Sequence, residues 1–121
     1  MRKLMLIAAL LALPATAQAM TVAQFLAKVN GLKAKGIFAM GSPDIKLLTN
    51  EMKGVAADYR AEIESARAAG RVPHSCPPAK GQAKLGSKDI LAEFEAIPLP
   101  QRGMSTKTAF YAMMKKRYPC R

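Results

Sequence analysis

The cysteines and the histidine are the residues of this chain that could carry nucleophilic or metal chemistry. Cys76 lies two residues after His74, and Cys120 is the second-last residue. A Cys–His pair can form a nucleophile, because the imidazole can take the thiol proton. A zinc site needs three or four ligands, which the single histidine and two cysteines that pair with each other cannot supply. We therefore expect no metal and no cofactor, and the role of the cysteines depends on their compartment.

The first 19 residues have the pattern of a cleaved secretory signal peptide. A short positive segment precedes ten apolar residues, 4–13, and small residues follow up to Ala19. Ten apolar residues are too few to span a bilayer, which needs about 20. We therefore predict a signal peptide over 1–19 and one exported domain over 20–121, located in an oxidising compartment such as the bacterial periplasm.

In that compartment we expect Cys76 and Cys120 to form a disulfide, because each is the only partner of the other in the chain. The bond would close a loop of 45 residues and stabilise the domain by about 4 kcal/mol in the chain-entropy treatment. A disulfide-bonded cysteine has no thiolate, so His74 is interpreted as an exposed loop histidine. We predict no catalytic residues and no enzymatic activity.

The basic charge of the mature domain is concentrated in its second half. Residues 20–121 hold 17 lysines and arginines against 8 acidic residues, a net charge of +9, of which 71–121 carry +7. Export and the lack of aromatic residues among the lysines argue against a nucleic-acid partner. An acidic protein surface or the anionic cell envelope fits this charge, and a merely solvated surface stays an alternative.

Apolar residues recur at spacings of three and four, which predicts an all-α, compact four-helix domain with one disulfide and no strand. The predicted helices cover 22–35, 43–69, 88–97 and 106–117, with their N-caps at Thr21, Ser42, Ser87 and Ser105. The apolar segment 37–40 is expected to pack onto the core between the first two helices. Residues 71–86 contain several prolines and glycines and are expected to form a loop.

A disulfide would bring the basic residues of this loop close to those at the end of the last helix. Such an electropositive surface, held by a covalent bond, suits docking onto an acidic protein. We therefore predict a partner-binding surface made of Arg71, His74, Lys80, Lys84, Lys88, Lys115, Lys116 and Arg117.

Several short motifs in roughly the last 45 residues resemble a known family. They are Cys76-Pro77-Pro78 after a long helix, Ile97-Pro98 at the end of a short one, and Tyr118-Pro119-Cys120 near the C-terminus. In these motifs the chain resembles the Rap/Tai family of periplasmic type VI secretion immunity proteins. The resemblance implies a small helical protein that blocks a cell-wall toxin, typically a peptidoglycan amidase, without catalysis. It also implies pairing of the two late cysteines.

Two functions are consistent with these observations. The first is an immunity or inhibitor protein that binds a cell-wall-targeting toxin in the periplasm. The alternative is a basic, envelope-associated structural or interaction protein without a toxin partner. The sequence leaves the oligomeric state open, a homodimer included.

Overall fold

The structure is a computed structural model that describes residues 20–121; the predicted signal peptide, 1–19, lies outside the described residues. Over this range it contains four α-helices, two short 3-10 helices and no strand, which confirms the predicted all-α class. The elements are α1 (Val22–Lys35), η1 (Gly36–Gly41), α2 (Pro43–Ala68), α3 (Ser87–Ala96), η2 (Leu99–Gln101) and α4 (Thr106–Arg117).

Three of the four predicted N-caps are confirmed. The Thr21 hydroxyl accepts from the amide of Gln24 in a complete capping box at the start of α1. Ser42 accepts from the amide of Asp44 and is followed by a proline at the first position of α2. Ser105 caps α4 in the same way. Local side-chain chemistry therefore sets the start of these helices.

The start of α3 differs from the prediction. Ser87 was expected as the cap, but it is the first helical residue, and Gly86 occupies the cap position. The carboxylate of Asp89 accepts from the Gly86 amide at 2.9 Å. An acidic side chain reaching back from the third helical position thus replaces the serine cap, and the helix begins one residue early. It ends at Ala96, because Ile97 is extended before Pro98.

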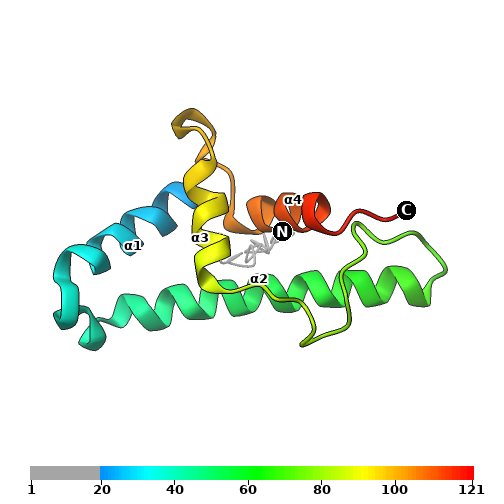
Figure 1. The fold of residues 1–121 in the computed structure, drawn as a ribbon, viewed down its shortest axis with the longest axis horizontal. Helices are drawn as coiled ribbons and strands as arrows, with labels where there is room; N and C mark the ends of the chain where they lie inside the picture. The colour runs from blue at the N-terminus through cyan, green and yellow to red at the C-terminus, as the bar shows by residue number, and fades with distance from the viewer. Residues whose placement is uncertain (1–19) are drawn as a thin grey trace, which may run out of the picture.

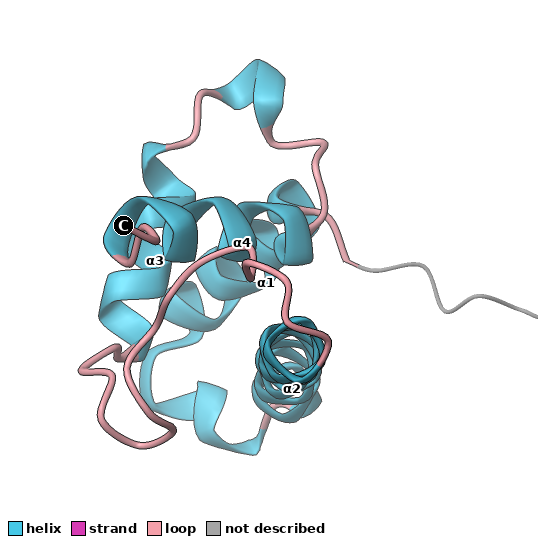
Figure 2. Cartoon of the chain, turned by 90° about the vertical axis from the view of Figure 1, so that its right-hand side faces the viewer, coloured by secondary structure: helices cyan, strands magenta, loops and turns pink. Residues whose placement is uncertain are grey.

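Helix α2 runs along the longest dimension of the molecule, and the other three helices gather on one side of it (Figures 1 and 2). One group of buried side chains joins all four helices and consists of Val22, Phe25, Leu26, Val29, Leu48, Phe94 and Ala109. The other joins α2 to α4 and consists of Val55, Tyr59, Ile63, Phe110, Met113 and Met114. Helix α2 therefore supports two adjacent halves of the core along its length. It ends at Ala68, one residue before the predicted end.

The start of the domain is tied to the middle of α2 through one carboxylate. Glu51 Oε1 accepts from the Met20 amide at 3.2 Å and from the Thr106 hydroxyl at 2.7 Å. The Thr106 side chain is fully buried, so this hydrogen bond satisfies a polar group that has lost its contact with water. Glu51 therefore holds the beginnings of α1 and α4 against α2.

The turn between α1 and α2 contradicts the prediction for segment 37–40. Of its four residues only Ala39 is buried, whereas Ile37 is 80% exposed and Phe38 and Met40 are both 84% exposed. The segment forms the 3-10 helix η1, which Gly36 enters with a φ of 57°. The small residue faces inward and the large ones face outward, because this tight turn leads directly from one long helix into the next.

Candidate functional site

The predicted disulfide between Cys76 and Cys120 is confirmed. The S–S distance is 2.05 Å and the two Cα atoms lie 4.9 Å apart. Beside it, the Cys76 amide donates to the Tyr118 carbonyl at 2.8 Å. The loop 69–86 is thus joined to the end of α4 by one covalent bond and one backbone hydrogen bond. We call this end of the molecule, made of 69–86 and 115–121, the stapled face.

The loop of the stapled face is also attached to α2. Arg60 Nη1 donates to the Pro78 carbonyl at 3.0 Å, and the buried hydroxyls of Tyr59 and Ser75 share a hydrogen bond. Both contacts come from the second half of α2, where Tyr59 and Arg60 lie. The loop is therefore held at its centre, over 75–78, by contacts with α2 as well as by the disulfide, and its basic side chains flank this fixed segment.

The structure brings several of the predicted docking residues together and separates others. Arg117 Nη2 lies 3.7 Å from Asp89 Oδ1, which sets the end of α4 against the first turn of α3, where Lys88 lies. Lys116 lines a small hollow together with Glu93. Lys80, Lys84, Lys88 and Lys115 are all exposed, as is Arg71 beyond the end of α2. The stapled face is thus basic, with one of its cations, Arg117, paired with a carboxylate.

His74 belongs to a different neighbourhood from these lysines. Its Nδ1 lies 3.3 Å from the Ser75 hydroxyl, and its ring centroid lies 5.5 Å from that of Tyr111. Lys107 Nζ lies 5.4 Å from the same Tyr111 ring and bridges Glu62 at 3.3 Å. The side chain of His74 is exposed, as predicted for a loop histidine. It therefore contributes to a surface of mixed charge between α2 and α4.

The Tyr111 hydroxyl is a site residue that the sequence did not indicate. Burial, together with the nearby carboxylates of Glu62 and Asp58, raises the pKa of Tyr111. Tyr111 and, less strongly, Lys107 in turn lower the pKa of Glu62 against an opposing effect of burial. At neutral pH the tyrosine is therefore neutral and the glutamate ionised. The ion pairs of Lys107 with Glu62 and Asp58 attach α4 to α2 beside the stapled face, whereas the buried Tyr111 hydroxyl makes no hydrogen bond within the described residues.

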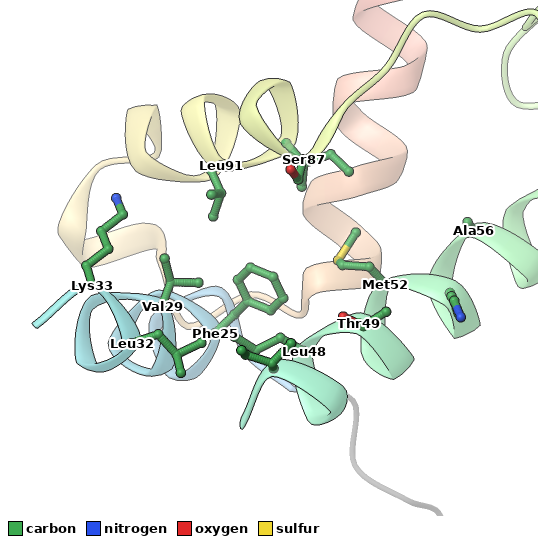
Figure 3. Close-up of a pocket in the computed structure, with 13 residues that line it drawn as sticks. Phe25, Val29, Leu32, Lys33, Leu48, Thr49, Met52, Ala56, Ser87 and Leu91 are labelled. Carbon is green, nitrogen blue, oxygen red and sulfur yellow. The ribbon is translucent and has the colours of Figure 1, made fainter. Parts of the chain in front are cut away.

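An apolar groove lies between α1, α2 and α3, at the other end of the long helix (Figure 3). It has a volume of about 670 Å³ and is open to solvent along one side. Its apolar wall comes from Phe25, Val29, Leu32, Ile45, Leu48, Met52, Ala56, Ile90 and Leu91. Lys33 lies at one end, paired with Glu95 at 3.4 Å. The sequence could not indicate this groove, because three separate helices form it.

Within 20–121 no three histidine, cysteine or acidic side chains come close enough to hold a metal ion. None of the helices described is long and apolar enough to cross a membrane. Comparisons with protein-family models, with curated proteins and with solved structures find no match to this chain. The resemblance to the Rap/Tai immunity proteins therefore stays a prediction, and the surfaces of the molecule itself carry the functional argument.

Proposed function

We propose that this protein is an exported binding protein that neutralises a cell-wall-targeting toxin, such as a peptidoglycan amidase, by covering the toxin's active site. The observation that carries the proposal is the stapled face. The Cys76–Cys120 bond places two basic segments, distant in sequence, beside each other. A disulfide of this kind suits the periplasm, where such bonds persist and where an amidase reaches its substrate.

A stapled surface is well suited to inhibition because it is ordered before it binds. Fixing a loop in advance removes an entropic cost that association would otherwise carry. The exposed Lys80, Lys84 and Lys115 would also attract an acidic partner and accelerate its association. The partner we expect is therefore a toxin with an acidic surface around its active-site cleft.

The test is inhibition of an amidase by the purified, oxidised protein. The enzyme to use is a cell-wall amidase encoded beside this gene, with hydrolysis of purified peptidoglycan as the readout. We expect the wild-type protein to inhibit, and the charge reversal of Lys80, Lys84 and Lys115 to glutamate to weaken inhibition at least about tenfold, since like charges facing each other at an interface cost several kcal/mol.

A matched control reverses the same number of charges at the opposite end of the molecule, at Lys35, Lys46 and Lys53. These three lysines are exposed, and the control changes the net charge by the same amount. We expect it to keep most of the inhibition. If the wild-type protein fails to inhibit, and deletion of the gene leaves cells as resistant as before to every neighbouring amidase, the proposal is wrong.

A further inference from the structure

The 3-10 turn η1 exposes more apolar surface in a few residues than any other part of the structure described here. Ile37, Phe38 and Met40 lie within four consecutive residues, and each is at least 80% exposed. The other strongly exposed apolar side chains are single residues in separate segments, Val72 in the loop after α2 and Leu99 in η2. Isolated exposed residues are ordinary, but a contiguous patch marks a surface that binds a protein or a membrane.

The geometry of the turn keeps these side chains outside. Three residues complete one turn of a 3-10 helix, so Ile37 and Met40 project on the same side, with Phe38 next to them. Ala39 is the residue that faces the core. The turn lies at one end of the longest dimension of the molecule, opposite the C-terminus (Figure 1). A flat surface can therefore meet it without touching the rest of the domain.

The charge around the turn is positive. Residues 28–46 contain four lysines and one acidic residue, Asp44. Asp44 is bonded to Lys28 at 3.4 Å, so its negative charge is already matched. Lys35 comes directly before the turn and Lys46 lies in the first turns of α2, and both are exposed. The apolar turn η1 is therefore bordered by two lysines, Lys35 and Lys46, that are not part of this ion pair and can contact an anionic surface.

We propose that η1 docks the protein on an anionic lipid bilayer, with Ile37, Phe38 and Met40 inserted among the lipids and Lys35 and Lys46 against the phosphate headgroups. A bilayer accepts protruding apolar side chains at its interface, and basic residues at the same level add electrostatic attraction. Ile45 and Leu47, which are 41% and 45% exposed, continue the apolar surface onto α2.

The protruding shape of the turn favours a bilayer over a protein. A protein partner would need a pocket matched to three projecting side chains, whereas a lipid surface adapts to them. The apolar groove between α1, α2 and α3 is the hollow surface of this region, and its lining ends at Lys33 and Ile45, on either side of the turn. The turn therefore borders the groove, but its own exposed side chains lie outside the groove lining.

The first test is cosedimentation of the oxidised protein with vesicles. Vesicles of phosphatidylcholine with phosphatidylglycerol are compared with vesicles of phosphatidylcholine alone. We expect binding to the anionic vesicles that weakens with added salt. Replacing Ile37, Phe38 and Met40 with serine should lower the partition at least tenfold, and Lys35→Gln with Lys46→Gln should lower it by about tenfold.

Matched controls remove the same chemistry from other parts of the molecule. Val72→Ser with Leu99→Ser removes exposed apolar side chains, and Lys115→Gln with Lys116→Gln removes two charges at the stapled face. We expect each pair to change the partition less than about threefold. For the lysine pair the reason is that charges farther than a Debye length from the lipid surface are screened. All variants share one N-terminus, so any contribution from 1–19 is the same in each.

The absence of tryptophan from the chain provides a second, site-specific readout. Phe38→Trp places a single indole in the turn, and Leu99→Trp places one in η2, where the native side chain is 75% exposed. We expect the emission of the first variant to shift to the blue with anionic vesicles and to be quenched by lipids labelled in their acyl chains. The second variant should show neither effect.

The proposal is overturned if the serine variant of the turn binds anionic vesicles as the wild type does, or if Phe38→Trp shows no blue shift. It is also overturned if the wild-type protein binds neither kind of vesicle. If the serine variant then also fails to inhibit the amidase, the turn is a protein-docking surface. Unchanged thermal unfolding of the variants excludes misfolding as the cause, since all three replaced side chains are exposed.

Discussion

The C-terminal end of α2 lies under a loop that is attached at several points, whereas its N-terminal end leads into a turn whose large side chains are exposed. At the stapled face, the disulfide, the Arg60–Pro78 hydrogen bond and the buried pair of Tyr59 and Ser75 hold the chain. At η1, the one buried residue is Ala39. Both ends carry basic residues, more of them at the stapled face; the degree of attachment and the exposed apolar surface distinguish the two ends further.

This difference separates two ways of binding. A loop fixed in advance suits a partner of defined shape, because little conformational entropy is lost on association. An exposed apolar turn suits a surface that adapts to it, because its affinity comes from the area removed from water. The two ends could therefore act on different partners. Variants that affect one end and leave the other unchanged test that separation.

The largest effect is expected from removing the disulfide. Replacing Cys76 and Cys120 with serine should lower the free energy of unfolding by about 4 kcal/mol, because the unfolded chain regains the freedom of the closed loop. Denaturant unfolding under oxidising conditions measures this loss. Hydrogen exchange should show faster exchange over 69–86 and no change over 36–41. Equal midpoints for the two proteins would contradict the assigned role of the bond.

The next effect is expected in the first half of α2, at Glu51. Replacing Glu51 with alanine leaves the buried Thr106 hydroxyl without its partner, and should cost about 2 kcal/mol of stability. Adding Thr106→Val removes the stranded hydroxyl, so the double variant should recover part of the loss. A double-mutant cycle from thermal or denaturant unfolding measures this coupling. Strictly additive single effects would show that the two side chains do not interact.

The helices and the disulfide could be predicted because their signals are local or exclusive. Capping residues such as Thr21 and Ser105 act on amides three residues away, and a three- or four-residue spacing identifies a helical face. The disulfide between Cys76 and Cys120 could be predicted from the number of cysteines, since two cysteines allow only one pairing within the chain. The end of α2 was predicted to within one residue because the signal for a helix end is also local.

The features that could not be predicted depend on how separate helices and loops are placed relative to one another. A run of four apolar residues, 37–40, is too short to reveal which side faces the core, so its exposure could not be derived. Tyr111 contacts His74 and lies beside Glu62, residues that are distant from it in sequence. The apolar groove needs three helices in place. In each case the missing information is the relative position of elements, which periodicity does not encode.

A smaller effect on stability is expected from the exposed turn itself. Phe38→Ser should change the free energy of unfolding by less than about 0.5 kcal/mol, because an exposed side chain contributes little to folding. Leu99→Ser, also strongly exposed, is the matched control and should behave alike. Thermal unfolding of both variants measures the effect. A large loss for Phe38→Ser alone would show that the turn stabilises the fold, and would weaken the contrast with the stapled face.

The smallest effect is expected from acid, and only beside the stapled face. Tyr111 and Lys107 lower the folded-state pKa of Glu62, so the stabilisation by the ionised Glu62 carboxylate is present above the unfolded pKa, about 4.3, and is lost as the pH falls through the lower folded value. The side chain is 55% exposed, so water screens most of the effect.

Glu62→Gln should therefore lower Tm slightly at neutral pH, and the difference from the wild type should vanish in acid. Glu64→Gln is the control, because it removes the same charge from another face of α2. If the wild-type and Glu62→Gln proteins keep the same difference in Tm from neutral pH down to strong acid, the carboxylate is coupled neither to Lys107 nor to Tyr111. The stapled face would then owe its order to the disulfide, to its hydrogen bonds and to the Arg117–Asp89 ion pair, without a contribution from Glu62.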